Sequence, residues 1–170
     1  MLPFCVLALA LPAPLTLAAG CKDDAPRPSE GSKPPLSATP QPMGHVQIAE
    51  APAAGDVEPL VRDALSKASA MHRRLIVYVG ATWCEPCQRF HRAAAQGELD
   101  ASFPDLDVLA FDLDRDGERL ASAGYVSKYI PLFALPSADG SASGKQVEGG
   151  VKGDGAVAYI TPRLKGLLAM

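Results

Sequence analysis

The stretch Trp83-Cys84-Glu85-Pro86-Cys87 decides the fold of this chain. It follows an apolar run, Leu75-Ile76-Val77-Tyr78-Val79, which predicts a buried strand, and it opens a helix-like stretch from Gln88 to Ala95. Unpaired backbone N–H groups at a helix N-terminus favour a thiolate, so they lower the pKa of the first thiol. The second thiol lies one turn further on, within reach to close a disulfide. The pattern therefore predicts a reactive dithiol.

This strand–dithiol–helix segment resembles the active site of the thioredoxin family, because strand, Trp, Pro and helix occur in the family's order. The resemblance implies a mixed β-sheet flanked by helices on both faces, an α/β fold, and thiol–disulfide oxidoreductase activity. It makes Cys84 the nucleophile and Cys87 the resolving thiol, and no cofactor is needed. The negative charge of Glu85 disfavours the thiolate form of Cys84. If Glu85 points into solvent, where its charge is screened, we expect the favourable effect of the helix terminus on the thiolate to be the larger one. Pro86 is tolerated in the first helical turn.

A second match is Ile130-Pro131. In the family, an Ile-Pro pair of this kind starts the strand facing the dithiol, and its peptide bond is cis. The resemblance implies that Ile130 and Pro131 bind a substrate strand, together with Pro86 and with Trp83, which we expect to cover the sulfur pair. A trans proline at the start of an edge strand remains the alternative. Gly149-Gly150 resembles the family's glycine near the dithiol, where a side chain would block partner approach.

Other uses of the two cysteines stay open. They could form a purely structural disulfide, although so small a loop gains little entropy. Together with His91 they could carry a metal, as a non-enzymatic carrier or binding module, although a structural zinc site wants a fourth ligand and His91 also fits an ordinary polar helix position. We therefore expect no metal site. Attached haem is disfavoured, because Gln88 stands where that motif needs His.

Tyr78 departs from the family, which usually has a buried Asp at this position. That carboxylate is thought to move the proton of the resolving cysteine, and a phenol with an ordinary pKa near 10 does so poorly. We therefore expect proton removal from Cys87 to be unassisted by a buried carboxylate. We do not expect another residue to replace this carboxylate well; the candidates are His72, Asp112 and Asp114.

The first 20 residues contain no Lys, Arg, Asp or Glu and are typical of a secretory signal peptide. They end Leu17-Ala18-Ala19-Gly20-Cys21, which resembles a bacterial lipobox. The resemblance implies that cleavage leaves Cys21 as the first residue and that Cys21 carries lipid. Since Cys5 is then removed, only Cys84 and Cys87 remain as thiols.

An ordinary cleaved signal and an uncleaved anchor remain alternatives, although prolines at 12 and 14 argue against a spanning helix. All three readings place the rest of the chain outside the cytoplasm. We expect a protein of the cell envelope, lipid-anchored to a membrane and facing the periplasm or the extracellular side. The net charge of −3 argues against a nucleic-acid partner. The expected partners are protein thiols and disulfides, and we expect a monomer.

Residues 21–55 form a predicted disordered linker, since seven prolines (26, 28, 34, 35, 40, 42, 52) stand among few large apolar residues. Slight alternation at 44–49 leaves a short edge strand open. Residues 56–170 form the predicted domain. Its helices are predicted at 57–71, 84–95, 118–123 and 153–168, and its strands at 75–79, 106–113, 131–135 and 145–148, with a turn at 114–117. This order, αβαβαββα, is that of the thioredoxin fold.

Overall fold

The computed structural model describes residues 44–170. They form nine elements: β1 (Gln47–Glu50), α1 (Val57–Ala70), β2 (Arg74–Gly80), α2 (Glu85–Ala95), β3 (Leu106–Asp112), α3 (Leu113–Ser122), β4 (Leu132–Pro136), β5 (Ala142–Glu148) and α4 (Gly155–Leu168). The expected signal peptide, Cys5, Cys21 and most of the expected linker lie outside the described residues.

The strands form one mixed sheet in the order β1-β3-β2-β4-β5. β1, β3 and β2 are parallel, whereas β4 is antiparallel to both β2 and β5. β2 lies at the centre of the sheet, and residues 75–80 of it are all buried. This double-sided burial explains why its sequence is a continuous apolar run rather than an alternating one.

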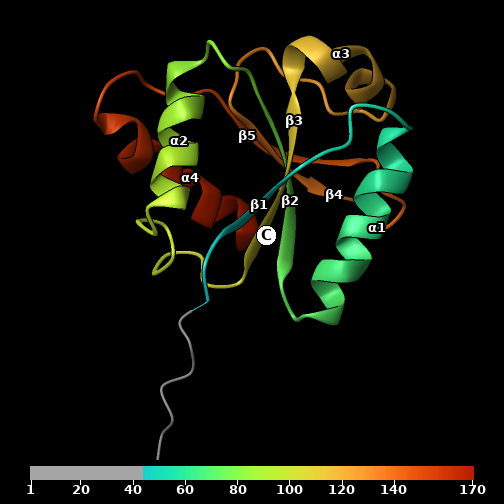
Figure 1. Ribbon diagram of the computed structural model, residues 1–170, viewed down its shortest axis with the longest axis horizontal. Helices are drawn as coiled ribbons and strands as arrows, with labels where there is room; N and C mark the ends of the chain where they lie inside the picture. The colour runs from blue at the N-terminus through green and yellow to red at the C-terminus, as the bar shows by residue number, and fades with distance from the viewer. Residues whose placement is uncertain (1–43) are drawn as a thin grey trace, which may run out of the picture. The chain divides into compact units, whose positions relative to one another are not determined.

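Helices cover both faces of the sheet, as predicted (Figure 1). On one face Ile76 and Tyr78 pack with residues of α2 and α4, including Phe90 and Leu164. On the other face Val77 and Val79 pack with residues of α1 and α3. Alternate residues of β2 therefore supply two separate cores, one on each side.

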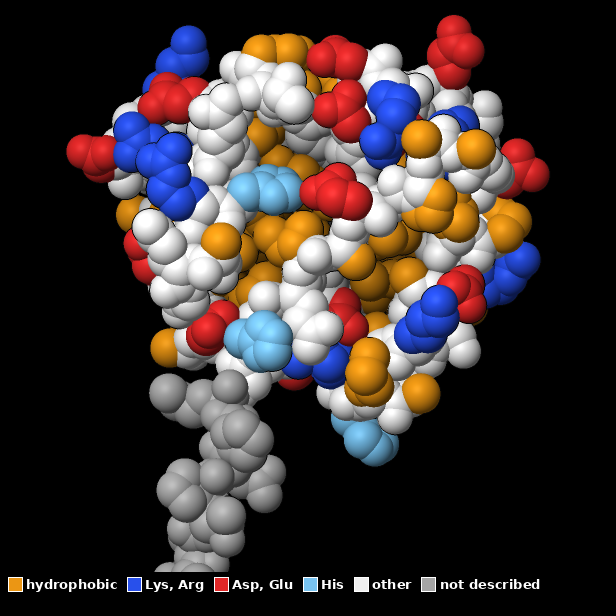
Figure 2. Space-filling view, viewed as in Figure 1, with side chains coloured by type: hydrophobic (Ala, Val, Ile, Leu, Met, Phe, Trp, Pro, Cys, Tyr) orange, Lys and Arg blue, Asp and Glu red, His pale blue; other side chains and the backbone are white. Residues whose placement is uncertain are grey.

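The linker boundary at residue 55 is wrong, because β1 belongs to the sheet. Gln47 pairs with Asp107 and Glu50 with Ala110. Val46 is buried, and its backbone N–H donates to the Asp100 carboxylate (3.0 Å). The folded unit therefore includes residues 44–55, and the edge strand that the alternation left open is present. Figure 2 shows the face that carries β1, which is hollowed, with hydrophobic side chains at the floor of the hollows.

The predicted turn at 114–117 is also wrong, because these residues form the first turns of α3. Asp112 caps this helix by accepting hydrogen bonds from the backbone N–H groups of Asp114 (3.0 Å) and Arg115 (3.1 Å). Asp116 is fully buried and pairs with Arg115 (2.8 Å) and Arg119 (2.9 Å). The segment is acidic and contains Gly, which is typical of a turn. It forms a helix instead because Asp112 caps its first turn and because Asp116 forms buried ion pairs with two arginines.

β5 begins at Ala142, three residues before the strand predicted at 145–148. The other predicted elements are present, with ends shifted by one or two residues. None of the helices within residues 44–170 combines the length and the apolar character needed to cross a bilayer.

The parallel strands give the domain two distinct ends. The chain enters at Gly44, beside the amino ends of β1, β2 and β3, whereas α2 starts just beyond the carboxyl end of β2 (Figure 1). The first turn of α2, which contains the dithiol, therefore lies at the opposite end of the sheet from Gly44.

Candidate active site

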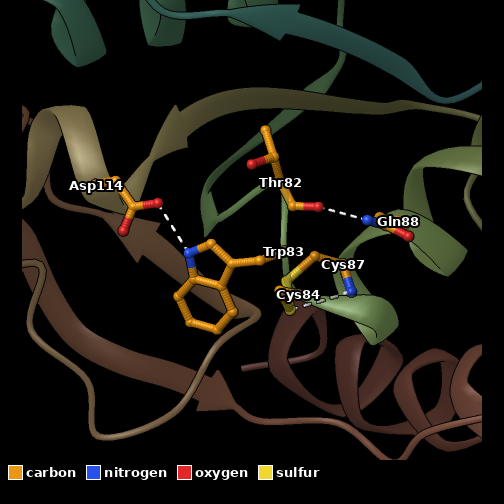
Figure 3. Close-up of a disulfide and its surroundings, with 6 residues drawn as sticks. All are labelled: Thr82, Trp83, Cys84, Cys87, Gln88 and Asp114. Carbon is orange, nitrogen blue, oxygen red and sulfur yellow. Dashed lines mark hydrogen bonds between the residues drawn. A yellow bond between two sulfur atoms is a disulfide. The ribbon is translucent and has the colours of Figure 1, made fainter.

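A disulfide joins Cys84 and Cys87, whose Cα atoms are 5.2 Å apart (Figure 3). Cys84 is the N-cap residue of α2, and its Sγ accepts a hydrogen bond from the Cys87 backbone N–H (3.3 Å). Cys84 is 5% exposed and Cys87 2%. The Cys87 backbone N–H in the first turn of α2 thus points at the Cys84 sulfur, where it and the helix terminus favour a thiolate once the disulfide opens.

Trp83 lies next to the disulfide (Figure 3). Its indole N–H donates to the Asp114 carboxylate (2.8 Å) in the first turn of α3, and the side chain is 65% exposed (Figure 3). On the other side, the Gln88 side-chain amide donates to the Thr82 carbonyl. The exposed indole thus offers a flat apolar surface next to the disulfide, and the expectation that Trp83 covers the sulfur pair stays a prediction.

Pro86, Pro131 and Gly150 meet beside the disulfide. The Ile130–Pro131 peptide bond is cis, as the resemblance implies. A Cβ added at Gly150 would lie 2.8 Å from Pro86 Cβ and 3.5 Å from Pro131 Cδ. The Gly149 backbone N–H donates to the Pro131 carbonyl (2.9 Å). Gly150 therefore allows a close approach that any side chain would prevent; substrate binding by Ile130, Pro131, Trp83 and Pro86 stays a prediction.

Glu85 is paired rather than free in solvent. Its Oε1 accepts hydrogen bonds from the Gly153 backbone N–H (3.1 Å) and from Arg89 (3.4 Å), and Arg89 also binds Asp154 (2.6 Å). The hydrogen bond to Asp154 is the main cause that raises the pKa of Arg89. The carboxylate that we expected to oppose the thiolate is thus balanced by Arg89, and it ties the first turn of α2 to the segment before α4.

A cavity of about 330 Å³ lies behind the disulfide. Its lining includes Cys87 and His91 from α2, Tyr78 from β2, Glu50 from β1 and Asp112 from the end of β3. Tyr78 is 2% exposed, and its hydroxyl has no hydrogen-bond partner among residues 44–170. Burial, and then the charges of Glu50 and Asp112, raise the pKa of this phenol. Tyr78 is thus no proton acceptor, in agreement with the expectation from sequence.

Sequence reasoning missed Glu50 as a site residue, because it lies in a segment read as linker. The sequence indicated His91 only as a possible metal ligand. Within the described part of the chain, no group of three or more His, Cys, Asp or Glu side chains is arranged to hold a metal ion. The usable signals were the four-residue spacing in α2 and the alternation that leads to Glu50.

No protein-family model matches the chain, and no curated protein sequence matches it. Solved structures of similar architecture include oxidised thioredoxin O1 from Arabidopsis thaliana (22% identity, TM-score 0.44, covering 74% of this chain and 96% of that one) and the thioredoxin of Trichomonas vaginalis (21%, TM-score 0.46, 73% and 96%). Oxidised thioredoxin from Plasmodium falciparum is another (18%, TM-score 0.41, 71% and 98%).

The fold follows from features of this chain alone. The parallel β1-β3-β2 order with antiparallel β4 and β5 puts the Cys84–Cys87 pair at the start of α2, and cis-Pro131 stands at the start of β4. Together with helices on both faces of the sheet, these features show that the chain has the thioredoxin-like fold.

Proposed function

We propose that this protein is a thiol–disulfide oxidoreductase that exchanges disulfides with protein partners through Cys84 and Cys87. The observation that carries the proposal is the Cys84–Cys87 disulfide at the N-terminus of α2. A structural disulfide spanning so few residues would stabilise the fold little, whereas the helix terminus gives this pair redox chemistry.

In the reducing direction, the Cys84 thiolate attacks one sulfur of a partner disulfide. The partner S–S bond breaks, and the other partner sulfur leaves as a thiolate that takes up a proton. The Cys87 thiolate then attacks Cys84 Sγ, so that the Cys84–Cys87 bond forms and the second partner sulfur is released. Two electrons pass from the dithiol to the partner, and the reverse sequence oxidises a partner.

Exposed apolar side chains around the disulfide support a polypeptide as the partner. Trp83 is 65% exposed and Tyr129 66%, and Tyr129 lies against Gly149 in the segment that approaches Pro86 and Pro131. Exposed aromatic rings beside a glycine-lined approach suit an apolar segment of another chain.

A trapping experiment tests the assigned roles. Cys87→Ser leaves the mixed disulfide unresolved, so it accumulates partners linked through Cys84, whereas Cys84→Ser does not. Non-reducing gels of cells that express each variant give the measurement. Equal trapping by both variants, or trapping by neither, contradicts the assignment.

We further propose that the protein works outside the cytoplasm, lipid-anchored through Cys21, and that it acts slightly more as a reductase than as an oxidase. The uncharged leader and the lipobox-like residues before Cys21 support the anchor. If Cys21→Ser still fractionates with membranes, the lipid is not what holds it there. A reduction potential near about −270 mV supports the reducing direction, and one near about −120 mV the oxidising direction.

A further inference from the structure

The resolving step needs a proton acceptor. A thiolate, and not a thiol, attacks the mixed disulfide, so Cys87 must first lose its proton. Cys87 is 2% exposed, so its thiol has little direct access to bulk water. The cavity behind the disulfide is the space that the Cys87 side chain shares with titratable groups.

His91 is the group in this cavity that is suited to take the proton. It lies four residues after Cys87, so both side chains project from the same face of α2 about 5–6 Å apart at Cβ, a span that one water bridges. The His91 ring stands edge-on to the Tyr78 ring, with centroids 5.0 Å apart. Burial lowers the pKa of His91, so at neutral pH the ring is uncharged and has a nitrogen free to accept a proton.

The other charged or titratable groups on this cavity have different roles. Asp112, from β3, accepts two backbone hydrogen bonds as the cap of α3, and Tyr78, from β2, holds its own proton. Glu50, from β1, is an exposed carboxylate whose charge acts on His91 in the direction that favours the protonated ring. No Lys or Arg lines the cavity.

We propose that His91 is the proton acceptor for Cys87, through water in this cavity, and that Glu50 stabilises the imidazolium that forms. The inference rests on the proposed oxidoreductase function. The proton leaves Cys87 Sγ for a ring nitrogen of His91, and the Cys87 sulfur uses the electron pair left behind to attack Cys84 Sγ. The departing partner thiolate takes up a proton from solvent, and the imidazolium returns its own to solvent through the cavity.

Stopped-flow reaction with 5,5′-dithiobis(2-nitrobenzoate) separates the two chemical steps. The full chain is used with Cys5→Ser and Cys21→Ser, so that only Cys84 and Cys87 react, and it is fully reduced first. Attack by Cys84 releases one coloured thiolate, and resolution by Cys87 releases a second. In His91→Gln we expect an unchanged first phase and a second phase slower by about 100-fold at pH 7, the lower end of what a positioned base supplies.

The pH profile of the second phase distinguishes proton transfer from a packing effect. A base acts when unprotonated, so in the wild type the rate is lost as pH falls through the pKa of His91, below the ordinary value of about 6.5, and is flat above it. In His91→Gln the rate instead rises with pH up to the pKa of an unassisted thiol, about 8.5 or higher. In Glu50→Gln, a change at an exposed position, the low-pH inflection moves to lower pH.

His45→Gln is the matched control, because His45 is exposed and does not line the cavity. We expect both of its phases and its pH profile to equal those of the wild type. A second phase in His91→Gln with the wild-type rate and pH profile overturns the role of His91 and leaves the proposed function standing. Absence of the first phase in the wild type overturns the proposed function itself. If His91→Gln does not fold, an unmoved inflection in Glu50→Gln overturns the inference.

Discussion

At the scale of single residues, the site depends on one glycine. Gly150 has no Cβ, and the position that a Cβ would occupy lies 2.8 Å from Pro86 and 3.5 Å from Pro131. Pro86 lies between the two redox cysteines, and Pro131 immediately precedes β4. A side chain at Gly150 would therefore push on the dithiol turn itself.

We predict that Gly150→Ala lowers the free energy of unfolding by about 1–3 kcal/mol, as overpacking does, and slows reduction of insulin disulfides. The control is Gly166→Ala in α4, where an added Cβ would meet nothing within 4 Å. That change should stabilise the protein by about 0.5–1 kcal/mol. Urea unfolding and an insulin turbidity assay measure both effects, and equal behaviour of the two variants contradicts the prediction.

Glu85 is a second determinant at this scale. Glu85→Gln removes a negative charge beside the Cys84 sulfur, while Arg89 stays paired with Asp154, and the loss of that charge stabilises the thiolate. A more stable reduced form raises the reduction potential, and we expect a rise of about 10–30 mV. Equilibration with glutathione redox buffers measures the change. A fall in the potential would mean that the lost bond to Gly153 outweighs the charge.

At the scale of elements, the start of α3 depends on a buried carboxylate. Burial alone would raise the pKa of Asp116, but hydrogen bonds from Arg115 and Arg119 outweigh it and lower the pKa. Because the folded-state pKa lies below the unfolded value of about 3.9, the ionised group stabilises the fold above that pH. The stabilisation is lost as pH falls below about 4.

Asp116→Asn should therefore lower the free energy of unfolding by about 2–3 kcal/mol at pH 7, and the difference from wild type should shrink towards pH 3. Asp63→Asn is the control, because its pair with Lys67 is exposed, and it should change stability by less than about 0.5 kcal/mol. Urea unfolding at both pH values is the measurement. A difference that does not depend on pH would mean that the charge of Asp116 is not what stabilises α3.

A second prediction at this scale concerns the contribution of β1 to stability. A chain that starts at residue 56, the boundary expected from composition, lacks the strand that covers β3, and Asp100 loses the bond from Val46. It should melt at least about 10 °C below a chain that starts at residue 44, since a lost strand costs several kcal/mol and each kcal/mol shifts the melting temperature of a domain of this size by about 3–6 °C. Equal melting temperatures would show that β1 contributes nothing measurable to the stability of the domain.

At the scale of the whole molecule, the sequence was sufficient to predict most of the architecture. Strong local patterns predicted it: the apolar run of β2, the helical spacing in α1 and α4, and the dithiol at a strand–helix junction. β1 was left open because four residues flanked by prolines give too little alternation, and α3 was shortened because Asp112 and Asp116 act through contacts that a linear pattern does not reveal. The cavity around His91 was beyond prediction, since it joins residues of four elements.

The separation between Gly44 and the first turn of α2 gives the domain a polarity. If the domain is attached to a surface at the end that contains Gly44, the Cys84–Cys87 pair lies at the end that faces the solution. Protein tethered to beads through its N-terminus should keep the rate of insulin reduction that it has in solution. Protein tethered through an azide-bearing side chain that replaces exposed Lys152, two residues from Gly150, should lose that activity. In such an orientation the Cys84–Cys87 pair would meet partners from the solution, and the end of the domain that contains Gly44 would take no part in the exchange.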